Sequence, residues 1–175
     1  VKENFEVYAI MRGERTPYGY DENIWSKVNV IKISREELNK SDLIERGNFD
    51  VICDLIAFDI ENVKKLVEKI KNDAFYLQIG SIWMYGNKEY IPVDELHPKN
   101  GFGEYGIQKG VIEDYLLDLA RKNQLRTSVV HPWHVSAKEW TPINPQGNVD
   151  KSVFKKLKNG EEIALPFLGL TTLQH

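Results

Sequence analysis

The sequence predicts an α/β fold built on a parallel sheet, and three observations support this class. Short apolar segments alternate with segments of helical periodicity along the 175 residues. The segment 49–58, FDVICDLIAF, is almost continuously apolar, as expected for a strand buried on both faces of a parallel sheet. The segments 59–72 and 104–122 each carry an apolar stripe suited to cover such a sheet. This alternation is typical of parallel sheets with helices on both faces.

The predicted strands are apolar runs that end at polar loops or at a proline. Gly13, Pro17 and Gly19 mark the loop after the first run, and Pro132 stops the last one. In chain order, the predicted strands cover residues 5–11, 28–33, 49–58, 75–81 and 126–132.

The predicted helices are recognised by their apolar spacing and by the residues at their ends. Asp59 is a suitable N-cap for the helix over 59–72, and Gly160 closes a short helix over 148–160. The longest predicted helix, 104–122, is apolar beyond one narrow stripe. The residues expected on its apolar side are Val111, Ile112, Tyr115, Leu116 and Leu119.

Composition and charge argue against several classes of protein. The net charge is −3 and the pI is near 5.9, so no basic excess is present to neutralise the phosphates of a nucleic acid. No apolar stretch is long enough to span a membrane. Cys53 is the sole cysteine, which rules out an internal disulfide and favours a reducing, cytoplasmic compartment. Because Cys53 lies in an apolar run, we interpret it as a small core residue.

A tyrosine and a lysine four residues apart give the first chemical signal. Tyr105 and Lys109 lie at the start of the predicted helix 104–122, and residues with this spacing share a helix face. A phenol with its ordinary pKa of about 10 is a poor base, but an adjacent ammonium group favours the phenolate. Such a phenolate could take a proton from an alcohol while hydride leaves the adjoining carbon. Two unrelated surface residues would show the same spacing, so the pair needs further support.

Ser81 supplies that support. It ends the predicted strand 75–81, at the edge where open α/β sheets bind ligands. A second motif does not help: residues 101–106, GFGEYG, match the glycine-rich pattern of dinucleotide-binding turns. Because they follow a polar loop rather than a strand, we interpret the match as accidental.

Ser81, the pair Tyr85-Gly86, Tyr105 and Lys109 together resemble the extended short-chain dehydrogenase/reductase superfamily and, within it, the NAD-dependent epimerase/dehydratase family. In that family a serine lies four residues before a Tyr-Gly pair, and a Tyr-x-x-x-Lys motif follows further along the chain. The segment 129–140, VVHPWHVSAKEW, occupies the place of the family's proline-containing turn after the sixth strand. The resemblance covers essentially the whole chain.

The resemblance implies a fold and two domains. It implies a Rossmann-like doubly wound parallel sheet over residues 1–135 and the start of a small substrate-binding lobe over 136–175. The family's first strand and its glycine-rich phosphate turn would be missing, because residues 5–11 match the second strand. The predicted strands 5–11 and 49–58 would then lack their common neighbour. We therefore expect these residues to need a further strand, from the parent chain or another chain, and to bind NAD(P) weakly alone.

The resemblance also implies roles for individual residues. Tyr105 would be the general acid/base, Lys109 would lower its pKa and bind the nicotinamide ribose, and Ser81 would hydrogen-bond the reacting oxygen. Arg12, after the first predicted strand, favours NADP over NAD, although an exposed loop arginine is an equal alternative. The other cofactor-binding residues that the resemblance implies are Leu55, Ile56, Ala57, Phe58, His131, Pro132, Trp133 and His134.

Substrate contacts are less sharply defined. The residues implied are Ser81, Trp83, Met84, Asn144 and Asn148; core packing or turn formation would explain the last four equally well. The family's usual Arg-Pro is His131-Pro132 here, and Ala137-Lys138 replaces a Gly-Pro, which leaves the substrate class open. His131 and His134 have a metal-like spacing, but no third ligand is evident, so no metal site is predicted.

The leading prediction is an NAD(P)-dependent epimerase, dehydratase or reductase that acts on a hydroxyl or carbonyl group, with a sugar nucleotide as the suggested substrate class. The alternative is a non-catalytic, nucleotide- or RNA-associated binding protein of the same fold. Members of the family often pair the helix that matches 104–122 with its copy, so a homodimer is expected. No membrane or nucleic-acid partner is expected.

Overall fold

A computed structural model of the chain describes residues 4–13, 21–71, 73–87, 90, 92–135, 144–146 and 150–165. Its elements, in chain order, are β1 (Tyr8–Met11), α1 (Glu22–Trp25), β2 (Asn29–Lys32), α2 (Arg35–Lys40), α3 (Leu43–Gly47), β3 (Val51–Asp54), α4 (Ile60–Val67), β4 (Phe75–Ile79), the 3-10 helix η1 (Ile82–Tyr85), α5 (Gly103–Arg121), β5 (Arg126–Val130) and α6 (Val153–Lys158).

The chain folds into two compact units. The sheet unit holds Ile10–Arg12 and Ile31–Pro132, and the terminal unit holds Val1–Ala9, Gly13–Val30 and Trp133–His175. The predicted catalytic residues all belong to the sheet unit. The division into a domain over 1–135 and a lobe over 136–175 stays a prediction.

The strands form two sheets. In the sheet unit, β3, β4 and β5 pair in that order, and both pairings are parallel. β1 and β2 form a separate two-stranded sheet. Its hydrogen bonds from Asn29 N to Val7 O and from Ile33 N to Met11 O, both 2.9 Å, keep a constant offset, as in a parallel pair. The predicted α/β class with parallel strands is therefore confirmed.

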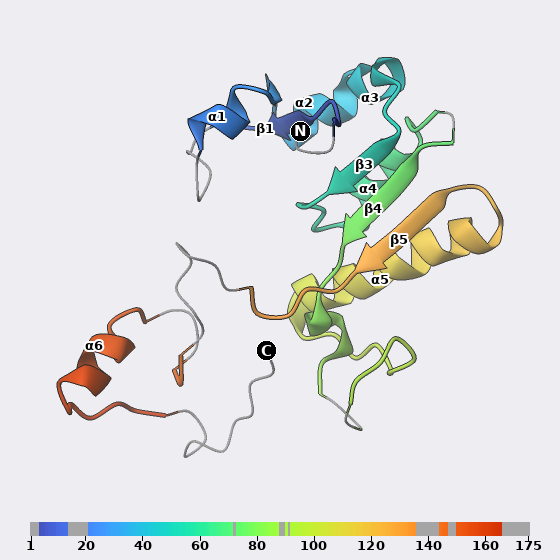
Figure 1. Ribbon diagram of the computed structural model, residues 1–175. Helices are drawn as coiled ribbons and strands as arrows, with labels where there is room; N and C mark the ends of the chain where they lie inside the picture. The colour runs from blue at the N-terminus through green and yellow to red at the C-terminus, as the bar shows by residue number, and fades with distance from the viewer. Residues whose placement is uncertain are drawn as a thin grey trace. The chain divides into compact units, whose positions relative to one another are not determined.

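Helices α4 and α5 cover one face of the three-stranded sheet, behind the strands in Figure 1. Asp59 caps α4 as predicted, since its carboxylate accepts a hydrogen bond from Asn62 N at 2.8 Å. Burial of apolar surface between helices and sheet is the main favourable contribution to this packing. The buried core residues are Leu38, Ile44, Ala57, Val63, Leu66, Tyr76, Ile112 and Leu116.

The opposite face of the same sheet is open within the described part of the sheet unit. Val51 on β3 is 55% exposed, Val130 on β5 is 48% exposed, and Cys53 is exposed as well. The prediction that the strand in 49–58 is buried on both faces is therefore wrong, and so is the interpretation of Cys53 as a core residue. The physical reason is that α4 and α5 both pack on the side of Ile52 and Tyr76.

Four elements lie where the sequence reasoning predicted no helix, namely α1, α2, α3 and η1. Each has six residues or fewer, so no apolar stripe stands out. The signal for α2 is its capping box, in which Ser34 and Glu37 bond each other's backbone. β3 is shorter than the predicted strand 49–58, because the Asp54 carboxylate accepts a hydrogen bond from Ile56 N at 3.2 Å and turns the chain.

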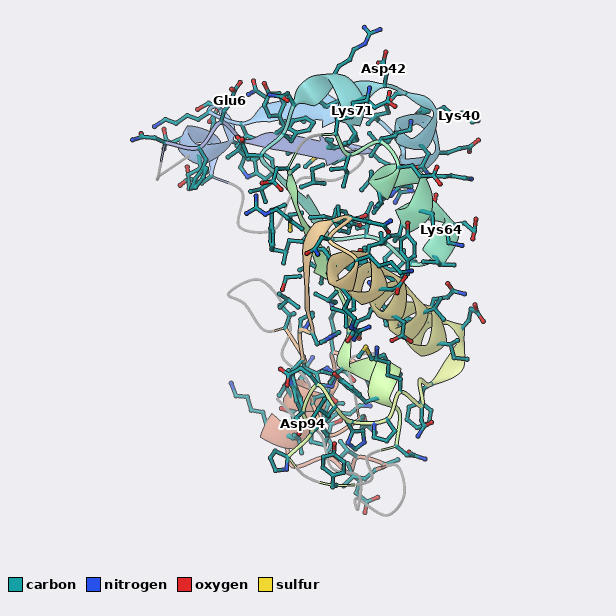
Figure 2. All side chains as sticks on the ribbon, turned by 90° about the vertical axis from the view of Figure 1, so that its right-hand side faces the viewer. Glu6, Lys40, Asp42, Lys64, Lys71 and Asp94 are labelled. Carbon is teal, nitrogen blue, oxygen red and sulfur yellow. The ribbon has the colours of Figure 1, made fainter. Side chains whose placement is uncertain are left out.

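Charged side chains occupy the outer surface of the helices. Figure 2 shows Lys40 and Lys64 directed outward, and these lysines pair with Glu36 at 2.6 Å and with Glu61 at 3.0 Å. Exposed pairs of this kind contribute little, about 0–1 kcal/mol each. None of the described helices combines the length and the apolar character that crossing a membrane requires.

Candidate active site

The predicted catalytic residues gather where β4 ends and α5 begins. The parallel strands β3, β4 and β5 point their carboxyl ends to the same side (Figure 1), and the amino-terminal turns of α5 pack against η1 there. Tyr105 and Lys109 lie one helical turn apart on α5. Tyr105 is 43% exposed, whereas Lys109 is only 2% exposed, so the pair joins an accessible phenol to a buried ammonium group.

Lys109 connects α5 to the end of β4. Its Nζ donates a hydrogen bond to the carbonyl oxygen of Ile79 at 2.7 Å. The same Nζ lies 5.6 Å from the ring centroid of Tyr105 and 5.5 Å from that of Phe58, within range of cation–π attraction. Burial lowers the pKa of Lys109 from its ordinary value of 10.5, and the charge of Asp54 opposes this shift.

Ser81 lies two residues after β4 and is buried. Its Oγ accepts a hydrogen bond from Trp83 N at 3.3 Å, which makes Ser81 the N-cap of η1. Met84 is fully buried and Trp83 is 52% exposed. Of the two predicted substrate contacts, Met84 therefore packs in the core, while Trp83 presents its ring at the surface.

Gly106 lets α5 pack closely against η1. A Cβ on Gly106 would lie 2.6 Å from the carbonyl oxygen of Trp83, closer than real Cβ contacts allow. The glycine lets the backbone of α5 lie directly against η1, which brings Tyr105 and Lys109 onto the segment that carries Ser81. In the segment GFGEYG this glycine therefore serves packing, and it lies inside a helix rather than directly after a strand.

A turn of apolar residues borders the Tyr105 ring. Leu55, Ile56 and Phe58 are all more than half exposed, while Ala57 is buried. The ring centroids of Phe58 and Tyr105 are 6.2 Å apart. The predicted cofactor-binding segment 55–58 thus offers an apolar surface beside the phenol.

A buried polar network that the sequence reasoning missed lies beneath this turn. The Asp54 carboxylate forms an ion pair with Arg35 and accepts a hydrogen bond from the Tyr76 hydroxyl at 3.0 Å. That hydroxyl also lies 2.9 Å from Gln78 Oε1, and Gln78 Nε2 donates to Ile79 O at 2.8 Å. Burial, and then the charge of Asp54, raise the pKa of Tyr76, so it stays a neutral hydroxyl.

A sequence signal for this network does exist. Tyr76 and Gln78 alternate along β4 and so face the same side, and Gln78 is directly opposite Asp54 in the register. Polar residues on the buried side of an apolar strand require partners, and that requirement points to a network.

The remaining predicted residues lie elsewhere. Arg12 follows β1 in the sheet unit and is exposed. Trp133 and His134 belong to the terminal unit. So does Asn144, which is buried and closes its own loop through Asp150 O at 3.1 Å and Gln146 N at 2.9 Å. Asn148 lies outside the described residues.

His131 and Pro132 follow β5 in the sheet unit. His131 Nε2 lies 2.9 Å from the Glu113 carboxylate. The part of the chain that the structure describes contains no cluster of three or more histidine, cysteine or acidic residues that could hold a metal ion.

Comparison with known families gives one match. The model of the NAD dependent epimerase/dehydratase family matches residues 46–171, well over half of the chain. A protein from Methanocaldococcus jannaschii, provisionally named a UDP-glucose 4-epimerase, is 26% identical over 144 residues. The match covers 82% of this chain and 47% of that protein, so the chain spans about half the length of this relative.

Solved structures show the same fold. A UDP-N-acetylglucosamine 4-epimerase from Methanobrevibacter ruminantium, in complex with UDP-N-acetylmuramic acid, matches with a TM-score of 0.66 at 18% identity, over 89% of this chain and 56% of that one. A UDP-glucose-4-epimerase from Stenotrophomonas maltophila, with bound NAD and formylated UDP-arabinopyranose, matches with a TM-score of 0.62 at 17% identity, over 83% of this chain and 53% of that one. At these identities the likeness establishes a Rossmann-like fold.

Proposed function

Because this chain belongs to the NAD-dependent epimerase/dehydratase family, we propose that it carries the proton-transfer residues of an NAD(P)-dependent enzyme acting on a hydroxyl group of a nucleotide sugar. The names of its relatives favour an epimerase among the three reactions that the sequence left open. The observation that carries the proposal is the position of Lys109. Its Nζ lies between the Tyr105 ring and the strand end that precedes Ser81.

In the proposed mechanism, Tyr105 accepts the proton of the substrate hydroxyl, and Ser81 holds the oxygen from which that proton leaves. NAD(P), when bound, would supply the acceptor for the hydride of the carbon that carries this oxygen. Lys109 holds positive charge beside the phenol, which favours the deprotonated form of Tyr105 while the proton is transferred. Return of the hydride to that carbon, together with return of the proton from Tyr105 to the oxygen, would restore the hydroxyl and complete the cycle.

The described residues fit one end of NAD(P). Tyr105 and Lys109 supply a hydroxyl and an ammonium donor, which suit a ribose diol, and the exposed apolar turn 55–58 suits an aromatic ring beside it. Arg12 supports a preference for the 2′-phosphate of NADP, because it follows β1. The cytoplasmic location inferred from the single cysteine stays a prediction.

One observation supports the alternative of a non-catalytic binding protein. The chain spans about half of its relatives, so a protein limited to these residues could bind a nucleotide without completing the chemistry. The two candidates differ in turnover and not in binding.

The test is turnover of UDP-glucose in the presence of NAD or NADP by the chain together with the further strand that the sequence predicts it to need, with the sugar products followed by NMR. Tyr105→Phe removes the transferable proton and keeps the ring, so turnover is expected to fall at least about 100-fold with little change in cofactor affinity. Tyr115→Phe, the same substitution further along α5, is the matched control and should keep the wild-type rate.

Two outcomes would contradict the proposal. Cofactor binding with no turnover of any nucleotide sugar by the wild-type chain would favour the binding-protein alternative. Equal rates for Tyr105→Phe and the wild type would remove Tyr105 from the mechanism.

A further inference from the structure

Glu113 is a buried carboxylate that the proposed mechanism does not use. It lies on α5 one helical turn after Lys109, between the core residues Ile112 and Leu116, and is 5% exposed. Burial raises the pKa of Glu113, but His131 and Lys99 outweigh this effect and hold the pKa below its ordinary value. A charged group in such a place is retained only where its partners compensate for lost hydration.

The closest of these partners is His131. Its Nε2 lies 2.9 Å from Glu113 Oε2, while Lys99 Nζ lies 3.4 Å from Oε1. The imidazole also lies directly against the backbone that precedes Ser81, since a Cβ on Gly80 would be only 2.4 Å from His131 Nδ1.

Backbone contacts tie the same two strand ends together. Gly80 N donates to Val130 O at 2.8 Å, so the residue before Ser81 and the residue before His131 are joined. The imidazole and the backbone hydrogen bond thus fix Gly80 from two sides. No bulkier residue at position 80 would leave room for the ring.

We infer that Glu113 and His131 are positioning residues for Ser81. Two side chains on one face of α5 hold neighbouring points of the same strand end: Lys109 through the Ile79 carbonyl, and Glu113 through the His131 ring against Gly80. The inference rests on the proposed function for the role of Ser81, but the geometry itself is tested without turnover.

Contacts from two elements hold the imidazole in this place. Glu113 from α5 lies against Nε2, and the centroid of the Tyr85 ring of η1 is 5.9 Å from that of the imidazole. Lys99 lies on the far side of the Glu113 carboxylate. Removal of the carboxylate charge is therefore expected to change how the ring lies against Gly80.

The experiment is an NMR comparison of the chain with its variants, observed at the backbone amides of Gly80 and Ser81. Glu113→Gln removes the carboxylate charge that faces the imidazole, so both amide signals are expected to move. Asp114→Asn is the control: Asp114 is the exposed neighbour that also pairs with Lys99, and both amide signals should keep their wild-type positions.

A second variant keeps the test decisive if Glu113→Gln does not fold. His131→Phe keeps a ring at this position but removes the partner of Glu113, so the Gly80 and Ser81 signals should move here as well. The inference is overturned if both amide signals keep their wild-type positions in Glu113→Gln or in His131→Phe. Because neither readout needs substrate, absence of turnover would count against the proposed function and leave this inference standing.

Discussion

Lys109 is a charged side chain in a place that disfavours charge. It is 2% exposed, and burial lowers its pKa. The acceptor for its ammonium group, the Ile79 carbonyl, also receives a hydrogen bond from Gln78 Nε2. The carbonyl would keep one hydrogen bond without the lysine, so loss of this contact leaves no unsatisfied buried acceptor. A residue kept at the expense of stability is typical of a functional site.

Lys109→Met is therefore expected to stabilise the chain while removing the proposed activity. The gain in the free energy of unfolding should be about 0.5–2 kcal/mol at neutral pH, measured by urea denaturation. The gain should shrink as the pH rises through the lowered folded-state pKa toward 10.5. In this range the wild-type lysine loses its charge in the folded state, so the cost of burying that charge disappears. Lys65→Met, at an exposed position on α4, should change stability by no more than about 0.5 kcal/mol. A marked loss of stability in Lys109→Met would show that the ammonium group supports the fold.

At the scale of single residues, the sequence predicted that Tyr105 and Lys109 share one helix face, but it did not predict which groups surround them. A spacing of four places two residues on one helix face, whatever the rest of the chain does. The contact between Glu113 and His131, and that between Arg35 and Asp54, join residues far apart in sequence. Such contacts depend on how the elements pack, which local patterns do not record.

Helix α5 carries two glycines whose roles differ. A Cβ at Gly106 would meet the Trp83 carbonyl oxygen at 2.6 Å, whereas at Gly110 the nearest atom, on Lys99, would be 3.7 Å away. The first glycine is thus required by the approach of η1. Gly110 has no such close contact, so its main effect is that of glycine in any helix, which is to lower helix stability.

The same substitution at these two positions should have opposite effects. Gly106→Ala is expected to lower the free energy of unfolding by about 1–3 kcal/mol, because backbone must move to admit the methyl group. Gly110→Ala should raise it by about 0.5–1 kcal/mol through its better helix propensity. Thermal unfolding of both variants measures the difference. Equal shifts would mean that η1 does not lie against α5 as described.

Elements with strong periodicity were predicted best. The long helix 104–122 corresponds to α5 within one residue at each end, and β4 and β5 lie inside their predicted ranges. The strand 49–58 was predicted too long, since an apolar run cannot show where Asp54 turns the chain. The short helices α1 to α3 were missed, because they are too short to show periodicity; side-chain caps mark only α1 and α2 among them.

On the scale of the whole molecule, α5 exposes apolar side chains to solvent. Ile107 and Val111 lie one turn apart on this helix and are 50% and 41% exposed. Two copies of this face brought together would bury apolar surface that a single chain leaves in water. We therefore expect a homodimer.

Light scattering tests this expectation. The wild-type chain should have about twice the 20.3 kDa mass of one copy, and Val111→Glu should shift it toward one copy by placing two like charges in the interface. Val135→Glu adds the same charge at an exposed position of the terminal unit, outside α5, and should leave the dimer intact. A wild-type chain that stays at a single mass of one copy over a wide concentration range would contradict the prediction.

The open face of the β3-β4-β5 sheet has a practical consequence. The chain's sole thiol, Cys53, stands on that face beside exposed Val51. Burial of part of the side chain raises the pKa of Cys53, so little thiolate forms at neutral pH and alkylation is slow. Whatever comes to cover the face would slow it further. The rate at which a maleimide dye attaches to Cys53 therefore reports whether this face of the sheet is exposed to solvent or covered.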